Sequence, residues 1–160
     1  DVKAILADGH DLGNHSEHHK DMATLGTSEQ KDELLTVHER VKELTGYEMH
    51  LFRPPYGSYN SALIDTAAAL GYSTIQWDVD SLDWKDLHAD QIVKRVTEKV
   101  QPGSIVLFHN AAKHTPEALP AILETLLQEG YTFLPISDLL LPGQYGQDYT
   151  IDHTGRQCPA

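Results

Sequence analysis

One arrangement recurs four times along this chain and constrains its fold more than any other feature. A helical stretch runs into a glycine, a tyrosine or histidine follows, and a short apolar segment comes next. A glycine just past the last helical residue is the usual left-handed C-cap, so each glycine marks a helix end. The predicted helices end at Gly9 or span 28–45, 61–70 and 116–129, and a fifth helix at 89–100 stops at Pro102-Gly103. Pro120 predicts that the helix at 116–129 starts late or bends there.

The segments between these helices predict short buried strands. Their interiors are apolar with little alternation, which is typical of parallel strands covered on both faces. Strands are predicted at 50–52, 73–79, 104–109 and 132–136, with a weaker one at 11–15. Alternating helices and buried strands indicate an α/β fold, either a doubly wound sheet or a (β/α) barrel. Residues 141–160 are polar and rich in turn residues, so we expect a surface extension of a domain that spans 1–140.

Length and composition fit one globular domain and exclude two classes of partner. The 160 residues are 40% hydrophobic and 22% charged, and the formal net charge is −12. Nucleic acids and anionic lipids are recognised by basic surfaces, so we expect neither as a partner. No apolar run approaches the roughly 20 residues of a membrane span. The single cysteine, Cys158, cannot build a disulfide framework within the chain.

The predicted strands run into unusual polar residues at their C-terminal ends. "RPPYG" (53–57), "DSLDW" (80–84), His109-Asn110 and the histidines after "DLGN" each follow one of them. In both candidate architectures the active site lies at the C-terminal ends of the strands. These four segments therefore predict one catalytic site.

Two pairs within the histidine cluster have the spacing of metal ligands. On a helical turn His15 and His19, four apart, would face the same side, and so would His15 and His18, three apart. Spacing alone does not choose between the pairs. His10 precedes the strand, and we interpret it as a loop residue. A hydrolytic metal site normally takes three protein ligands and keeps one position open, so either pair needs a further ligand.

The other strand-end residues supply complementary chemistry. Arg53 is a permanent cation suited to holding a carboxylate. The two prolines after it lack an N–H, so Tyr56 offers the first backbone donor of the turn to a developing oxyanion. Asp83 and His109 suggest an acid–base pair, in which a carboxylate orients an imidazolium that protonates a leaving group.

Taken together, these segments resemble the polysaccharide deacetylase family, the NodB-like carbohydrate esterases. "GHDLGNHSEHH" is similar to the second motif of that family, H-[ST]-x-x-H, and "RPPYG", "DSLDW" and "IVLFH" are similar to its third, fourth and fifth motifs, in the same order. The resemblance implies a distorted, incomplete (β/α) barrel. It also implies metal-dependent hydrolysis of N-acetyl groups on an amino sugar, with zinc as the metal and cobalt or nickel as alternatives.

The resemblance further implies a role for each candidate residue. It assigns the metal to His15 and His19 and leaves His18 at a variable position. The remaining roles are an oxyanion donor (Tyr56 N–H), a general acid (His109), its orienting carboxylate (Asp83), an anchor for the catalytic base (Arg53), and a substrate pocket (Trp84, Leu107 and Pro55).

One departure from the family pattern limits this assignment. The first family motif, two consecutive aspartates that supply the base and the third metal ligand, does not occur in these 160 residues. The chain begins without an initiator methionine and in the middle of a helical pattern. We therefore expect an N-terminal fragment of the same protein, bound as a partner, to carry the aspartate pair and any signal segment.

The family acts on several acetylated polysaccharides. We expect peptidoglycan N-acetylglucosamine, with chitin-like oligomers or acetylated xylan as alternatives, and hence an extracellular or cell-envelope location. The missing aspartates support a second hypothesis, a catalytically inactive carbohydrate-binding or scaffolding domain. Plain metal storage is disfavoured because the other histidines are dispersed along the chain.

Overall fold

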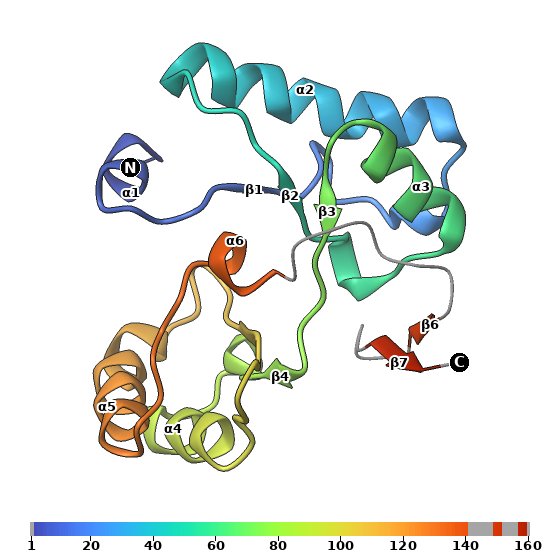
Figure 1. The fold of residues 1–160 in the computed structure, drawn as a ribbon. Coiled ribbons are helices and arrows are strands. Elements are labelled where there is room, and N and C mark those ends of the chain that lie inside the picture. Colours follow the sequence, from blue (N-terminus) through green and yellow to red (C-terminus); the bar gives the residue numbers. More distant parts are fainter. Residues whose placement is uncertain (1, 141–148, 152–156, 160) are drawn as a thin grey trace. The chain divides into compact units, whose positions relative to one another are not determined.

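A computed structural model gives the fold of this chain and describes residues 2–140, 149–151 and 157–159 (Figure 1). The chain forms two compact units, Asp1–Gln76 and Trp77–Ala160. Both units combine helices with short parallel strands, so the predicted α/β class is confirmed. None of the helices in the described residues has the length and apolar character needed to cross a membrane.

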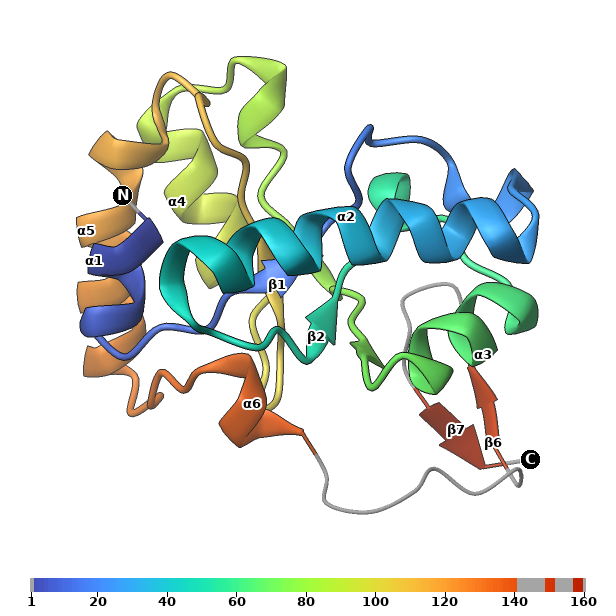
Figure 2. The same cartoon turned by 90° about the horizontal axis from the view of Figure 1, so that it is seen from above.

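The first unit is a three-stranded parallel sheet packed against helices. Its strands are β1 (Gly13–Asn14), β2 (Leu51–Phe52) and β3 (Ser73–Thr74), in the order β1-β2-β3. Its helices are α1 (Val2–Ala7), α2 (Thr27–Thr45), α3 (Ser61–Ala69) and two 3₁₀ turns, η1 (Met22–Thr24) and η2 (Pro55–Gly57). The longest of them, α2, runs past β1 and β2 (Figures 1 and 2).

The core of the first unit joins the sheet to α2 and α3. Its buried members are Met22, Leu34, Met49, Phe52, Leu63, Ala67 and Tyr72. Phe52 on β2 and Leu34 on α2 have no exposed surface, so the sheet and the long helix share one apolar interior. The strand ends that carry "NH" and "RPP" emerge from this interior.

The second unit contains a two-stranded parallel sheet and a helix pair. Its strands are β4 (Val79–Asp80) and β5 (Val106–Leu107), and its helices are η3 (Asp83–Lys85), α4 (Ala89–Thr97), α5 (Thr115–Gln128) and α6 (Ile136–Leu139). Helices α4 and α5 bury Ile92 and Val96 against Ala118, Ile122 and Leu126. Two further strands, β6 (Tyr149–Ile151) and β7 (Gln157–Pro159), pair antiparallel.

The glycine C-caps of the predicted helices are confirmed. Gly9, Gly46, Gly71 and Gly130 all adopt positive φ, between 76° and 90°. Helix α5 begins at Thr115 and includes Pro120, so the predicted late start is wrong. Helix α4 ends at Thr97, three residues before the predicted end at Val100.

Two strand predictions are wrong for the same physical reason, namely the choice of pairing partner. The predicted strand at 73–79 is two strands, because Ile75 N–H donates to Phe52 O whereas Asp78 N–H donates to Ile105 O. The predicted strand at 132–136 pairs with no described residue, and helix α6 begins at Ile136. A strand is stable only with a paired neighbour, which an apolar run does not itself specify.

The segment 141–160, predicted as a surface extension, is mostly outside the described residues. Within it, β6 and β7 form a short ladder in which Thr150 lies opposite Cys158. The β-branched residues of "YTI" favour such pairing. Sequence analysis did not predict this ladder.

We expect Gly46→Ala to destabilise the chain by about 1 kcal/mol, because Gly46 has φ 76° and a Cβ is strained in that region. No atom lies within 4 Å of a Cβ built there, so the loss would come from the backbone rather than from a clash. Gly46→Asn is the matched control, since asparagine tolerates the left-handed region and should recover part of the loss. Denaturant unfolding measures both variants, and equal stability of Gly46→Ala and the natural chain would contradict the C-cap role.

Candidate active site

The histidine loop, residues 15–20, follows β1 and is not helical. Ser16 and His19 have positive φ, 66° and 51°, and Ser16 Oγ accepts a hydrogen bond of 2.9 Å from His19 N–H. The predicted helical turn is therefore wrong. The turn made by these two residues nevertheless brings the rings of His15 and His19 together edge to face, with centroids 4.9 Å apart.

One hydrogen bond fixes the tautomer of His15. Its Nδ1 lies 2.5 Å from the carbonyl oxygen of Arg53. A carbonyl only accepts hydrogen bonds, so Nδ1 carries a proton, and in the neutral ring the lone pair is then on Nε2. Metal-ligating histidines commonly donate their second ring N–H to a carbonyl in this way. The same orientation of the ring is found in His15.

His18 points to a different partner. Its ring Nδ1 lies 2.9 Å from Glu33 Oε1, and its backbone N–H donates to Glu33 Oε2 at 2.8 Å. Burial alone would raise the pKa of Glu33, but hydrogen bonds from His18 and Lys20 outweigh it and lower that pKa. Of the two pairs that spacing left open, the structure brings together the rings of His15 and His19 and engages His18 with α2.

Asn14, at the end of β1, anchors the start of the histidine loop. It is 1% exposed, and its Nδ2 donates to Leu34 O at 2.8 Å and to the Tyr72 hydroxyl at 3.1 Å. Its Oδ1 accepts from Ser16 N–H at 3.0 Å. Sequence analysis missed this role. An asparagine between a strand glycine and the histidine cluster was the available signal.

The "RPPYG" segment forms the tight turn η2 next to the histidines. Tyr56 has φ 61°, and its ring centroid lies 4.7 Å from that of His19. The hydrogen bonds of the turn come from the next two residues, Gly57 N–H to Pro54 O and Ser58 N–H to Pro55 O, so neither uses Tyr56 N–H. Burial lowers the pKa of the Arg53 guanidinium, which nonetheless stays a cation.

In the second unit Asp83 and His109 form a hydrogen-bonded pair. Asp83, 2% exposed, accepts from His109 N–H at 2.9 Å, from His109 Nδ1 at 2.8 Å and from the Thr115 hydroxyl at 2.6 Å. Burial alone would raise the pKa of Asp83, but these hydrogen bonds outweigh it and lower the pKa. The ionised carboxylate therefore orients the His109 ring and leaves Nε2 for proton transfer. Thr115, the first residue of α5, was missed by sequence analysis.

A cavity of about 260 Å³ lies beside this pair. It is lined by Asp83, Trp84, Asp86, His109, Asn110, Ala111, Ala112 and Lys113. Trp84 is 56% exposed and its ring lies 6.4 Å from that of His109, measured between centroids. Leu107 is buried on β5 and does not belong to this lining, whereas Pro55, the third residue predicted to touch substrate, is buried in the first unit.

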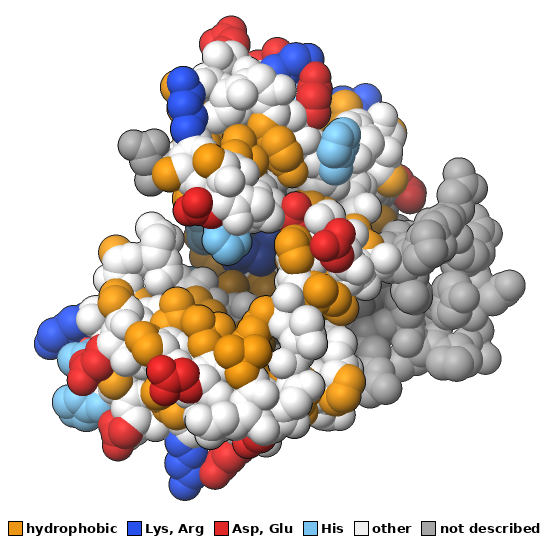
Figure 3. All heavy atoms as spheres, turned by 60° about the vertical axis from the view of Figure 1, so that its left-hand side comes forward, with side chains coloured by type: hydrophobic (Ala, Val, Ile, Leu, Met, Phe, Trp, Pro, Cys, Tyr) orange, Lys and Arg blue, Asp and Glu red, His pale blue; other side chains and the backbone are white. Residues whose placement is uncertain are grey.

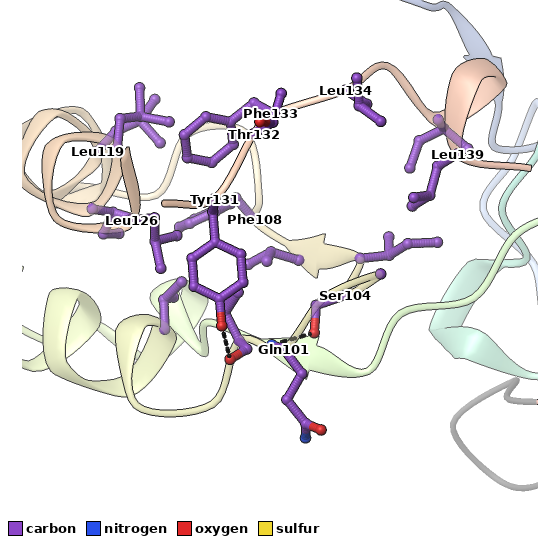
Figure 4. Close-up of a pocket in the computed structure, with 18 residues that line it drawn as sticks. Gln101, Ser104, Phe108, Leu119, Leu126, Tyr131, Thr132, Phe133, Leu134 and Leu139 are labelled. Atoms are coloured by element: carbon purple, nitrogen blue, oxygen red, sulfur yellow. Dashed lines mark hydrogen bonds between the residues drawn. The ribbon is translucent and has the colours of Figure 1, made fainter. Parts of the chain in front are cut away.

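A second cavity, of about 290 Å³, lies between α4, α5 and the segment 131–139 (Figure 4). Aliphatic and aromatic side chains dominate its lining, and no described lining residue carries a carboxylate or an imidazole. Nearby, Leu119, Leu123, Leu127, Phe133 and Leu134 are exposed. Apolar side chains also gather on the face shown in Figure 3. Without acid, base or metal donors, this cavity is not the candidate active site.

Within each unit, the structure brings together part of the predicted set. His15, His19, Arg53 and Tyr56 lie together in the first unit, and Asp83, Trp84 and His109 in the second. Over the described residues, no group of three His, Cys, Asp or Glu side chains is placed to hold a metal ion. By themselves, the two imidazoles of His15 and His19 do not make a complete ligand set.

A family model and individual relatives of known sequence all point to one family of proteins. The model of the polysaccharide deacetylase family matches residues 1–75. A peptidoglycan-N-acetylglucosamine deacetylase of Bacillus cereus is 35% identical over 144 residues, which cover 87% of this chain and 67% of the relative. The peptidoglycan-N-acetylmuramic acid deacetylase PdaA of Bacillus subtilis is 34% identical over 143 residues, 87% of this chain and 54% of the relative.

A solved structure extends the comparison to the fold. A CE4 family pseudoenzyme from Bacillus anthracis superimposes with a TM-score of 0.82 at 34% identity, over 86% of this chain and 49% of that chain. A mutant of that protein with restored enzymatic activity is similar to the same degree, with a TM-score of 0.81. The chain spans about half the length of several curated relatives; it covers 54% of PdaA, for example.

Proposed function

Because this chain belongs to the polysaccharide deacetylase family, we propose that it supplies most of the active site of an enzyme that hydrolyses N-acetyl groups on peptidoglycan N-acetylglucosamine. The observation that carries the proposal is the pair of preorganised groups, His15 with His19 and Asp83 with His109. The two parallel sheets would belong to one distorted, incomplete (β/α) barrel. A cell-envelope or extracellular location follows from this substrate.

The imidazole pair fits a divalent metal. Zinc, with cobalt or nickel as alternatives, accepts two neutral histidines together with a further ligand. His15 and His19 would hold the ion, which when bound polarises the acetyl carbonyl and activates water. Since the 160 residues contain no consecutive aspartates, we propose that the third ligand and the base come from another part of the natural protein, such as an N-terminal segment.

The remaining residues of this chain act on the substrate and its protons. Tyr56 N–H donates to the developing oxyanion. His109, oriented by Asp83, protonates the departing amine through Nε2. Arg53 anchors the carboxylate that takes the proton of the attacking water. Trp84, which lines the cavity beside His109, would contact the acetyl group.

A second candidate function is an inactive carbohydrate-binding or scaffolding domain. Two observations favour it, the missing aspartate pair and the similarity to a CE4 family pseudoenzyme. Such a domain would keep Trp84 and Tyr56, whose exposed rings, 56% and 68% accessible, are suited to contact with sugar. Catalysis and binding therefore need to be measured side by side.

Acetate release from N-acetylated peptidoglycan by the intact natural protein tests the proposal. We expect release that a chelator abolishes and added zinc restores, because both the carbonyl and the water need the ion. Chitin oligomers and acetylated xylan, assayed in parallel, rank the substrates. Retention on peptidoglycan without acetate release, by protein loaded with metal, would instead support the inactive domain.

A further inference from the structure

We propose that Glu33, on α2, is a positioning residue for the imidazole pair of His15 and His19. The inference rests on the metal-binding function proposed above and extends it to a residue outside the ligand set. Glu33 is 4% exposed, although carboxylates are almost never buried to this degree unless they are paired. Its three polar partners all belong to the histidine loop.

Both carboxylate oxygens of Glu33 are used. Oε2 accepts from His18 N–H at 2.8 Å, and Oε1 lies 2.9 Å from His18 Nδ1 and 3.3 Å from Lys20 Nζ. Glu33 thus fixes both the backbone and the side chain of the residue that precedes His19. A buried carboxylate with charged or N–H partners makes stronger hydrogen bonds than a neutral acceptor.

Glu33 lies on a face of α2 that forms hydrogen bonds and ion pairs with six residues between Asn14 and Leu25. We call this the α2 contact face; its members are Gln30, Glu33, Leu34 and Arg40. Positions three, four and seven apart share one side of a helix, so the four lie along a single stripe.

Each member of the α2 contact face contacts a different part of the segment. Gln30 Nε2 donates to Met22 O at 3.0 Å and to Leu25 O at 3.2 Å. Leu34 O accepts from Asn14. Arg40 makes a two-pronged ion pair with Glu17, at 2.8 and 2.9 Å, but its side chain is 64% exposed and such surface pairs contribute little. The buried Glu33 is therefore the strongest attachment of the histidines themselves.

The backbone of the histidine loop explains why this attachment is needed. Ser16 and His19 have φ of 66° and 51°, a region that only a few per cent of non-glycine residues adopt, histidine more readily than serine. Such a conformation persists only when surrounding contacts determine it. The hydrogen bond from His18 N–H to Glu33 is adjacent to His19, so its loss would let His19 leave this conformation and separate from His15.

Glu33→Gln tests the inference. An amide offers one acceptor oxygen in place of two, so we expect the histidine loop to loosen. Zinc affinity should fall by about tenfold, the lower end of the loss for outer partners of metal ligands, because Glu33 contacts the neighbour of a ligand rather than a ligand. Chelator competition measures the affinity. Glu48→Gln is the matched control, because Glu48 also contacts one histidine and one lysine, His38 at 2.8 Å and Lys42 at 2.6 Å, but has no contact with the segment 14–25.

A second readout needs no metal. In the metal-free protein we expect a nuclear Overhauser effect between the rings of His15 and His19 in the natural chain and in Glu48→Gln, and its loss in Glu33→Gln. Unchanged affinity and an unchanged ring contact would overturn the inference. Weaker zinc binding with the ring contact intact would also overturn it, since Glu33 would then act through charge rather than position.

The design separates this inference from the proposed function. If the natural protein binds no zinc, the proposed function fails, while the ring contact in the metal-free protein still decides the role of Glu33. If Glu33→Gln does not fold, Glu33→Asp replaces it. Aspartate keeps the negative charge but is one methylene shorter, so its carboxylate is drawn away from both His18 N–H and the His18 ring. A weakened contact between the rings of His15 and His19 is then the expected result, and an unchanged one overturns the inference.

Discussion

Asp83→Asn is expected to reduce turnover of the intact protein by about 10²- to 10⁴-fold, the range of a general acid that has lost its orientation. The amide cannot accept from His109 N–H, the His109 ring and the Thr115 hydroxyl together, as the carboxylate does. At least one buried donor then lacks an acceptor. Breaking such a buried pair costs about 3 kcal/mol, which most domains survive because they are stable by ~5–15 kcal/mol.

The control is Asp86→Asn, which makes the same chemical change three residues later. The Asp86 side chain is 74% exposed, and its ion pair with His114 is long, 3.9 Å. We expect it to change stability by less than about 0.5 kcal/mol and to leave turnover within a few-fold. Steady-state kinetics and denaturant unfolding of both variants separate the two sites. Comparable losses of turnover in both would show that charge near the cavity, rather than orientation of His109, matters.

The stability difference between the natural chain and Asp83→Asn should shrink in acid. The pKa of Asp83 is lowered in the folded chain, since its hydrogen bonds outweigh the effect of burial. The unfolded chain therefore binds the proton at a higher pH than the folded chain does. The contribution of Asp83 is complete above about pH 4 and is lost as pH falls through the folded-state pKa. Unfolding measured from pH 7 to pH 3 checks this, and a constant difference would mean that folding does not change the pKa of Asp83.

Sequence patterns predicted the elements whose signals are local. Four helices end at the glycines that the C-cap rule predicts, namely Gly9, Gly46, Gly71 and Gly130. Strand pairing depended on partners far away in sequence, which is why 73–79 divides between two sheets and 132–136 forms no strand with the described residues. An apolar run carries no information about which neighbour will accept its hydrogen bonds.

In the candidate site, too, local sequence signals predicted the residue types, whereas contacts between residues distant in sequence were missed. The residue types in "HSEHH" and "RPPYG" indicated the chemistry, and His15 and His19 do lie together. They do so through positive φ at Ser16 and His19 rather than through a helical turn. Asn14, Glu33 and Thr115 were missed, because their roles consist of contacts across 20, 15 and 32 residues of sequence.

His15→Ala is expected to lower zinc affinity more than any change outside the ligand pair. Outer partners of metal ligands contribute about 10- to 100-fold, and loss of a direct ligand should exceed that range. The structure gives His15 one defined donor, Nε2, because Nδ1 is taken by the Arg53 carbonyl. His19→Ala should match His15→Ala, since the two rings lie together. Titration with zinc under chelator competition measures each variant.

His18→Ala is the discriminating control. Its ring faces Glu33, so we expect its loss to weaken zinc binding only through the histidine loop, by less than about tenfold against the larger loss for a direct ligand. If His18→Ala abolished binding and His19→Ala preserved it, the ligands would be the pair three residues apart, and His18 would have to leave Glu33 to bind. If His18 bound the metal, the buried carboxylate of Glu33 would lose its contact with the His18 ring, which is unfavourable. For this reason we expect His15 and His19 to be the ligands.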